Sequence, residues 1–271
     1  MKWKRISKEN AAFQVFTALM RSHRKRQQHD RFIVEGVIPV NLCVQSQLRI
    51  ESILISEGRT LSRWAEGLLA TVDCESVYQL AAPLMADLSG RDDSSEVLLV
   101  AEYPHVDVAT LTLEEVQRSV ILDRPSSPGN LGAIIRSCDA FGLDAVFLTG
   151  HHADPYDPKS ITASRGTVFT VPVLPIESNT QLADLLTRLR RCHDRFCLYG
   201  SSGKYGSDIR ALFPSPSFGL IVGNETYGMS DFLKQQTDEV VRIEMRGAAS
   251  SLNVACATSI LLYELLARGG A

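Results

Sequence analysis

From residue 119 to the end of the chain, short apolar runs alternate with longer stretches in which apolar residues recur every three or four positions. The short runs have the length of buried strands, and the longer stretches have the periodicity of helices. Predicted strands span residues 120–122, 145–148, 168–174, 196–199, 218–222 and 240–243, and predicted helices span 131–141, 182–189 and 252–267. Strands that alternate with helices favour a mostly parallel sheet covered on both faces, so this part of the chain is predicted to be α/β.

The first hundred residues show a second, smaller α/β pattern. Strand-like runs at 53–55 and 97–100 stand among helical stretches at 9–20, 37–47, 61–70 and 81–88. Residues 104–118 read as a linker with a short polar helix. We therefore predict two domains, 1–103 and 119–271, joined by the linker 104–118.

The composition is that of a globular protein with a well-buried core. Of the 271 residues, 45% are apolar and 22% are charged. The apolar runs are far too short to span a membrane, and the basic start of the chain lacks the apolar stretch and cleavage site of a secretory signal. We expect a cytoplasmic protein.

The cysteines indicate neither a disulfide framework nor a metal site. The six are scattered and form no Cys-x-x-Cys pair, which is typical of free thiols in a reducing compartment. The nearest approaches to a ligand cluster are Cys192, His193 and Cys197, and His151, His152 and Asp154. Neither has a second ligand pair beside it, so no metal is predicted.

Positive charge is concentrated at the start of the chain. Residues 1–31 hold nine Lys and Arg residues against Glu9 and Asp30, whereas the whole chain has a net charge of −3. A basic segment on an acidic body is typical of proteins that bind the phosphate backbone of nucleic acids, although a solvated terminus has the same composition. The candidate RNA-binding residues are Arg21, Arg24, Lys25, Arg26 and Arg31.

Three segments of the second domain place polar residues beside strong apolar elements, where α/β sheets bind ligands. In residues 122–142, Asn130 is expected to cap a helix that stops at Gly142. The apolar stripe of this helix leaves Arg136 pointing away from the packing face, at about 100° per residue. By itself, this segment also fits an ordinary capped helix with a surface arginine.

The other two segments follow predicted strands. In residues 218–229 a buried strand runs into Gly223-Asn224-Glu225, a turn in which the carboxylate is a candidate base or hydrogen-bond acceptor. In residues 243–265 a loop of small residues leads into an apolar helix, expected to be capped by Ser250 or Ser251. The free amides of its first turn, together with Asn253, can bind a polar ligand.

Phosphate-binding loops are absent from the sequence. The stretch Gly200-Ser-Ser-Gly-Lys204 has too few residues between its glycines for a Walker loop, and no Ser or Thr follows the lysine. No G-x-G-x-x-G follows the first strand of either half. The usual dinucleotide and nucleotide-triphosphate sites are therefore excluded.

Taken together and in this order, the three segments resemble the three motifs of the SpoU-type 2′-O-methyltransferases of the SPOUT superfamily. Residues 128–142 (PGNLGAIIRSCDAFG), 221–229 (IVGNETYGM) and 251–255 (SLNVA) correspond to the first, second and third motif. The resemblance covers about residues 120–267. A weaker similarity, at residues 24–36, links the first domain to the small substrate-binding fold, like that of certain ribosomal proteins, found in part of this family.

The resemblance implies an AdoMet-dependent RNA methyltransferase that modifies a ribose 2′-hydroxyl, with ribosomal RNA favoured over tRNA. It also implies a deep trefoil knot, no metal, and a homodimer whose active site draws on both chains. The implied cofactor positions are Tyr199, Gly200, Gly223, Ile243 and Leu252, and the implied catalytic positions are Asn130, Arg136, Glu225, Ser251 and Asn253. The chain departs from the family pattern at Glu244, where proline is frequent, and at Arg246, which adds a charge.

The roles that we expect follow from the chemistry of methyl transfer, in which positioning contributes most. The arginine guanidinium keeps its proton at neutral pH, because its pKa lies above about 12, so it cannot act as a simple base. Arg136 is therefore expected to hold a phosphate and to stabilise the developing alkoxide. One alternative is an RNA-binding protein of the same fold without activity, against which the complete polar set argues. The other is a nucleotide-dependent enzyme of small molecules, against which the missing Gly-rich loop and the basic start of the chain argue. Calorimetry with AdoMet would distinguish this second alternative, and methyl transfer to RNA would distinguish the first.

Overall fold

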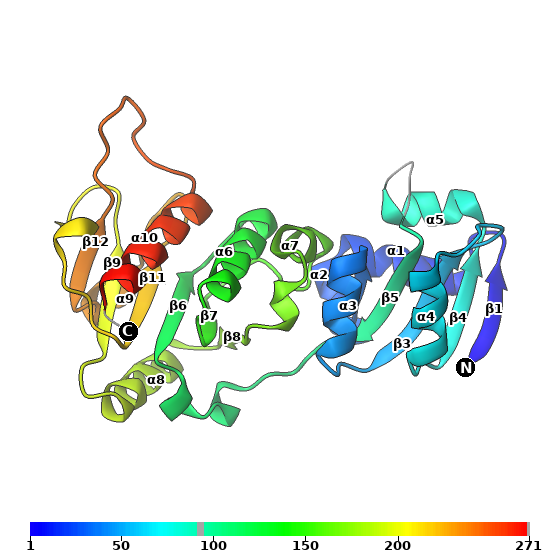
Figure 1. Cartoon of the computed structure of the whole chain (residues 1–271), viewed down its shortest axis with the longest axis horizontal. Helices are drawn as coiled ribbons and strands as arrows, with labels where there is room; N and C mark the ends of the chain where they lie inside the picture. Colours follow the sequence, from blue (N-terminus) through cyan, green and yellow to red (C-terminus); the bar gives the residue numbers. More distant parts are fainter. Residues whose placement is uncertain (91–94, 270–271) are drawn as a thin grey trace. The chain divides into compact units, whose positions relative to one another are not determined.

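The structure, a computed structural model, describes residues 1–90 and 95–269 (Figure 1). The chain forms two compact units. The first consists of Met1–His105 and Tyr156–Phe169, and the second of Val106–Pro155 and Thr170–Ala271. A segment from the second half of the sequence therefore completes the unit that the first half builds.

In the described part of the first unit, five strands form a mixed sheet in the order β1-β4-β3-β5-β2. The strands are β1 (Lys2–Ile6), β2 (Arg31–Glu35), β3 (Ile50–Ser56), β4 (Ser76–Leu80) and β5 (Val97–Glu102). Strands β1, β4 and β3 run parallel, and β5 is antiparallel to both of its neighbours. The sequence predicts β3 and β5 but not the other three, whose apolar runs are short or interrupted by polar residues.

Helices cover both faces of this sheet (Figure 1). They are α1 (Ala11–Arg21), α2 (His23–His29), α3 (Val37–Gln45), α4 (Arg63–Thr71), α5 (Ala82–Ser89) and α7 (Pro158–Ser164), with the 3-10 turn η3 (Thr167–Phe169). The four helices predicted for the first domain correspond to α1, α3, α4 and α5, with ends that differ by one or two residues. On α1, Phe13, Phe16 and Leu19 are buried in one cluster with side chains of α5 and the sheet.

The basic segment at the start of the chain is folded, and one of its cations lies in the interior. The side chain of Arg26 is 1% exposed. It donates to the carbonyl oxygen of Leu19 at 2.8 Å and forms an ion pair with Asp157 at 2.7 Å. The predicted RNA contact is therefore wrong for Arg26. Its charge is used to hold α2 to the end of α1 and to the start of α7.

Replacing Arg26 with methionine is expected to lower the free energy of unfolding by about 3 kcal/mol, because a carboxylate and a carbonyl oxygen lose their charged partner. Urea denaturation of the variant and the parent protein measures this difference. The control is Arg24→Met, because Arg24 is exposed on the same helix. Equal losses in the two variants would contradict the structural role of Arg26.

The second unit is built on a parallel sheet, as predicted. Its described strands lie in the order β10-β12-β9-β11-β6-β7-β8, and their pairings are all parallel. They are β6 (Arg118–Asp123), β7 (Ala145–Thr149), β8 (Val173–Ile176), β9 (Cys197–Ser201), β10 (Ser207–Asp208), β11 (Phe218–Val222) and β12 (Glu239–Arg242). The strand predicted at 168–174 begins later, at Val173, because Thr167–Phe169 forms the turn η3 of the first unit.

Both faces of the parallel sheet are covered, which is also as predicted. The helices are α6 (Pro128–Ala140), α8 (Asn179–Cys192), α9 (Asp231–Gln236) and α10 (Val254–Arg268), with the 3-10 turns η1 (Val108–Thr110), η2 (Leu113–Glu115) and η4 (Ile209–Ala211). Side chains of α8, α9, η1 and η2 share one buried cluster with alternate strand residues such as Ile121. Helices α6 and α10 lie side by side, with the Ser137 and Ser259 hydroxyls 2.7 Å apart (Figure 1). None of the helices described in the chain is long and apolar enough to cross a membrane.

Candidate functional site

Four neighbouring strands of the second unit, β12, β9, β11 and β6, run parallel and therefore end at one edge of the sheet. The segments that follow β6, β11 and β12 are the three that the sequence predicts to carry ligand-binding polar residues. The carboxyl ends of adjacent parallel strands are where α/β proteins usually bind ligands. The topology thus gathers the three segments at a single edge.

Asp123 and Arg124, at the end of β6, anchor this edge. The carboxylate of Asp123 is buried and accepts from Nε and Nη2 of Arg124, at 2.8 and 3.0 Å, and from the backbone N–H of Ser230 at 2.6 Å. Arg124 has a left-handed backbone with a φ of 53°. Its Nη2 also donates to the carbonyl oxygen of Gly228, and its own carbonyl oxygen accepts from Nδ2 of Asn224 at 2.8 Å. The pair therefore ties the end of β6 to the loop after β11.

The loop from Gly223 to Met229 is held in a tight turn. The backbones of Asn224 and Gly228 exchange two hydrogen bonds, of 2.8 and 3.1 Å. The Oδ1 atom of Asn224 accepts from two further backbone N–H groups of the loop. A Cβ atom at Gly223 would lie 2.4 Å from the Gly228 carbonyl carbon and from the Met229 nitrogen. Position 223 therefore requires glycine, because the two ends of the turn approach each other so closely.

Polar side chains from all three segments meet in one hydrogen-bonded group, which we call the Glu225–Asn130–Asn253 cluster. Glu225 accepts from Nδ2 of Asn130 at 3.2 Å and from Oγ of Ser126 at 3.1 Å. Asn130 in turn accepts, through Oδ1, from Nδ2 of Asn253 at 3.1 Å. The cluster joins the loop after β11 to the first turn of α6 and to the start of α10.

Two helix caps differ from those expected. Asn130 does not cap α6; Ser127 does, with its Oγ accepting from the backbone N–H of Asn130, and a proline follows at the first helical position. Helix α10 is capped by Asn253 and not by Ser250 or Ser251. Asn253 uses Oδ1 for the cap and Nδ2 for the cluster, so the start of α10 and the cluster have one side chain in common.

Glu225 is held in its charged form. Burial raises the pKa of its carboxyl group, but hydrogen bonds from its own backbone N–H, from Asn130 and from Ser126 together outweigh this effect and lower the pKa below the ordinary value. The group is therefore a carboxylate at neutral pH. A carboxylate with a lowered pKa is a weak base, so its contacts suit it to orienting its neighbours.

The predicted cofactor positions lie at the same edge. They are Tyr199 and Gly200 in β9, Gly223 after β11, Ile243 after β12, and Leu252 in the loop before α10. The Tyr199 side chain is buried and accepts through its hydroxyl from the backbone N–H of Ser215 at 2.9 Å. Any contribution of Tyr199 to a ligand site therefore comes from its backbone.

The chemistry of this edge fits a ligand that is held by the main chain. From Ile243 to Leu252 the backbone N–H groups make no hydrogen bond to other described residues. Glu244, inside this loop, forms an ion pair with Arg210. A Cβ atom at Gly200 would lie 2.8 Å from Cγ2 of Thr237, so the backbone there is also closely packed. Unused amide donors in the loop after β12, together with closely packed glycines at positions 200 and 223, match the backbone contacts that the family resemblance implies for AdoMet.

Two of the predicted catalytic residues stand outside the cluster. Arg136 is exposed, and it makes no hydrogen bond or ion pair with any residue that the structure describes. It lies six residues beyond Asn130 on α6, which at about 100° per residue places it on another side of the helix. Ser251 is exposed in the loop before α10. A single chain therefore assembles Asn130, Glu225 and Asn253 but does not bring Arg136 to them.

Of the other predicted RNA-binding cations, two are exposed and have no acidic partner within the described residues. These are Arg24 and Lys25 on α2. Arg21 lies 3.6 Å from Asp87, and Arg31 forms an ion pair with Glu51. A cation that an acidic residue already neutralises attracts phosphate less, so Arg24 and Lys25 are the stronger candidates.

The described residues contain no group of three or more His, Cys, Asp or Glu side chains that could hold a metal ion. The six cysteines are free. Burial raises the pKa of the Cys43 and Cys138 thiols, so both are neutral and unreactive at physiological pH.

Sequence reasoning missed Asp123, Arg124 and Ser126, although all three hold the edge together. Their one sequence signal is the change from an apolar strand to the polar stretch Asp123-Arg-Pro-Ser126. That change predicts a loop but gives no indication that Arg124 adopts a left-handed backbone or that Asp123 is buried.

Two family models match the chain. That of the SpoU rRNA methylase family matches residues 117–263, and that of the SpoU L30e-like domain matches residues 10–100. Each model falls on one of the two α/β patterns in the sequence.

Similar proteins and structures agree with these matches. The chain is 37% identical to a 23S rRNA (uridine(2479)-2'-O)-methyltransferase of Streptomyces viridochromogenes, over 96% of the chain and 91% of that protein. It is 28% identical to the 23S rRNA (guanosine(2553)-2'-O)-methyltransferase RlmP of Bacillus subtilis, over 91% of the chain and 92% of that protein. Among solved structures, the SpoU methyltransferase AviRb of Streptomyces viridochromogenes in complex with AdoMet matches with a TM-score of 0.87 and 35% identity, over 96% of the chain and 98% of that structure.

Proposed function

This chain belongs to the SpoU rRNA methylase family, and from that membership we propose that it transfers a methyl group from AdoMet to a ribose 2′-hydroxyl of ribosomal RNA. The observation that carries the proposal is the Glu225–Asn130–Asn253 cluster. It joins polar residues of the three family motifs at a sheet edge rich in unused backbone amides. The named relatives that span nearly the whole chain act on 23S rRNA, which favours ribosomal RNA over tRNA.

The residues of the chain would contribute mainly by positioning. Bound AdoMet supplies an electrophilic methyl group on a sulfonium. The peptide groups at Gly200, Gly223 and Ile243–Leu252 hold it, and Ser251 with Asn253 shapes the pocket. Glu225 and Asn130 would orient the groups around the ribose. Arg136 would bind the adjacent phosphate and stabilise the negative charge that develops on the 2′-oxygen as its proton passes to solvent.

The domain roles follow from the same proposal. Residues 119–271, apart from Tyr156–Phe169, which belongs to the first unit, would form the methyltransferase domain with the family's trefoil knot. Residues 1–103 would form the RNA-binding domain, with 104–118 between the two domains. We place the protein in the cytoplasm with its RNA.

Methyl transfer to a ribose can be tested directly. Purified protein is incubated with AdoMet carrying a labelled methyl group and with unmodified ribosomal RNA. A 2′-O-methyl group blocks alkaline cleavage at its nucleotide, so the label is expected in alkali-resistant dinucleotides. Label in mononucleotides would mean base methylation, and binding of AdoMet and RNA without transfer would favour the inactive RNA-binding alternative. Either result would overturn the proposal.

We infer that the protein is a homodimer and that α10 lies in the interface. Ile260 and Tyr263 on this helix are 40% and 61% exposed, and the Tyr263 ring lies 6.3 Å from that of Phe141. Large apolar side chains exposed together mark an interaction surface.

Light scattering is expected to give the mass of a dimer, and Tyr263→Glu is expected to shift it towards the monomer, because the charge would be buried without a partner. Tyr205→Glu is the matched control, since Tyr205 is 50% exposed in the loop between β9 and β10 and not on α10. A monomeric parent protein at micromolar concentration would contradict the inference.

Charge reversal of Arg24 and Lys25 together is expected to weaken RNA binding and to flatten its salt dependence. Two lost phosphate contacts lower the slope of log K against log salt by about 2 units on duplex-like RNA and by somewhat less on single strands. The control is the same reversal at Arg188 and Arg191 on α8. AdoMet affinity should not change, and an unchanged slope in the Arg24 and Lys25 variant would remove these residues from the RNA site.

A further inference from the structure

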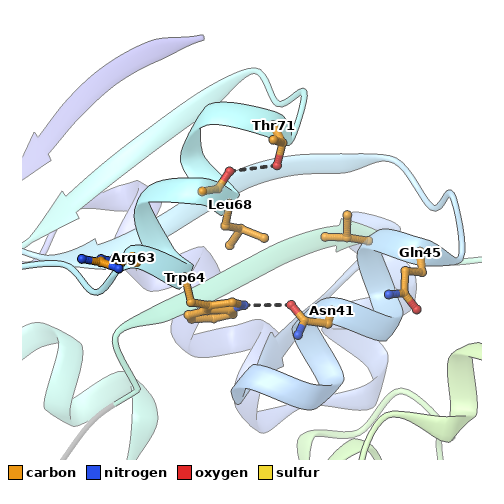
Figure 2. Close-up of a pocket in the computed structure, with 8 residues that line it drawn as sticks. Asn41, Gln45, Arg63, Trp64, Leu68 and Thr71 are labelled. Carbon is orange, nitrogen blue, oxygen red and sulfur yellow. Dashed lines mark hydrogen bonds between the residues drawn. The ribbon is translucent and has the colours of Figure 1, made fainter.

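The first unit has a groove between α3 and α4. Its volume is about 410 Å³, a size typical of small-ligand sites. Figure 2 shows it between the two helices, with Trp64 from α4 lying beside Asn41 from α3. Its lining includes Asn41, Gln45, Arg63, Trp64, Gly67 and Leu68.

The polar groups of the groove are arranged but largely unused. The Trp64 indole donates through Nε1 to Oδ1 of Asn41 at 2.8 Å, which fixes the ring in place (Figure 2). The Asn41 amide nitrogen, the Gln45 amide and the Arg63 guanidinium make no hydrogen bond or ion pair with other described residues. The lining thus combines a half-buried indole with amide donors, an amide acceptor and a cation, and it contains no acidic residue.

Gly67 keeps the groove open. It lies in the middle of α4, where glycine is less favourable than alanine by about 0.5–1 kcal/mol. Its backbone does not have a positive φ, and a Cβ atom there would meet nothing within 4 Å. Neither the backbone nor the packing of the described residues requires glycine here, and a larger side chain at this position would extend from the lining into the open space of the groove.

We propose that this groove binds an unstacked base of the RNA substrate, a recognition site separate from the edge where methyl transfer occurs. Trp64 and Leu68 offer flat and apolar surface to the face of a base, the two amides can bond to its edge, and Arg63 attracts the adjoining phosphate. Single-stranded RNA is commonly recognised in this way. The inference rests on the proposed function, because it takes RNA as the ligand.

The test fills the groove without disturbing the fold. Gly67→Leu places a better helix former in α4, so thermal stability should stay equal or rise. The KM for ribosomal RNA should rise by about 10-fold, while kcat at saturating RNA and AdoMet affinity stay near those of the parent protein. Ala70→Leu, on the same helix but outside the lining, should leave all four quantities unchanged. Trp64→Phe keeps a stacking ring and should bind RNA almost as well as the parent, whereas Trp64→Ala should not.

Binding of RNA in the groove can be measured directly by tryptophan fluorescence. The chain has two tryptophans, Trp3 and Trp64, so replacing Trp3 leaves Trp64 as the one source of tryptophan emission. In a Trp3→Phe background, a short single-stranded oligoribonucleotide should quench the emission of Trp64 in a saturable way, and Gly67→Leu should abolish the quenching. Unchanged KM in Gly67→Leu together with no quenching would overturn the inference and would favour a protein ligand for the groove. If the parent protein methylates ribosomal RNA, that result leaves the proposed function standing. A parent protein without transfer refutes the function itself.

Discussion

Replacing Arg136 with alanine is expected to lower the rate of methyl transfer by about 10² to 10³ while AdoMet binding stays near normal. The guanidinium is exposed and makes no hydrogen bond or ion pair with any described residue, so its removal costs the fold little. Its charge is needed where negative charge collects, at the phosphate and the developing alkoxide. Single-turnover kinetics and calorimetry with AdoMet separate the two quantities, and near-normal turnover would contradict the role given to Arg136.

The position of Arg136 outside the Glu225–Asn130–Asn253 cluster makes a sharper experiment possible. If a site combines Arg136 of one protomer with Glu225 of the other, a mixed dimer of Arg136→Ala and Glu225→Ala chains has one site with both changes and one with neither. Co-expression should then restore up to half of the parent activity in the mixed dimer, although each homodimer is inactive. An inactive mixed dimer would mean that Arg136 acts on the cluster of its own chain.

Gly223→Ala is expected to remove AdoMet binding and with it all measurable transfer. The added Cβ atom would lie 2.4 Å from backbone atoms of Gly228 and Met229, and backbone cannot move aside as a flexible side chain can. Overpacking of this kind costs typically about 1–3 kcal/mol. The turn must open to relieve it, and opening displaces both Glu225 and the peptide group at the predicted cofactor position.

The matched control for this change is Gly129→Ala. Gly129 lies in the first turn of α6, near the same cluster, but the nearest atom to its Cβ would be Oγ of Ser127 at 3.9 Å. Gly129→Ala should therefore keep both AdoMet affinity and transfer. Calorimetry on both variants measures the contrast, and equal affinities would show that the close approach at Gly223 does not matter for the cofactor.

The sequence predicts the second unit better than the first, and the cause is burial. Strands of a parallel sheet are covered on both faces, so β7 and β11 are continuous apolar runs that stand out. An edge strand such as β1 carries Lys2, Lys4 and Arg5 and has no such run. The short helices α7 and α9 are too brief to show a period. The knot cannot be seen in periodicity at all, and it stays a prediction from the family.

In the candidate site, the family motifs identify side chains that hydrogen-bond to one another. The positive charge of a residue, by contrast, does not show whether that residue is exposed to bind RNA. Asn130, Glu225 and Asn253 lie in motifs, and the structure joins them by hydrogen bonds. Arg26 looks like its neighbours Arg24 and Lys25 in the sequence, yet it is buried against Asp157, a partner far along the chain. The sequence also does not identify the N-cap residues of α6 and α10, because several adjacent Ser and Asn residues could each cap the helix.

Methylation of a ribosomal RNA ribose by this chain can be tested in the cell by mapping 2′-O-methyl groups in total RNA from strains with and without its gene. Alkaline fragmentation followed by sequencing reads every nucleotide at once. We expect the loss of a 2′-O-methyl group in ribosomal RNA when the gene is removed, its return with the parent gene, and no return with the Arg136→Ala gene. Identical 2′-O-methylation of all RNA in the two strains would contradict this expectation.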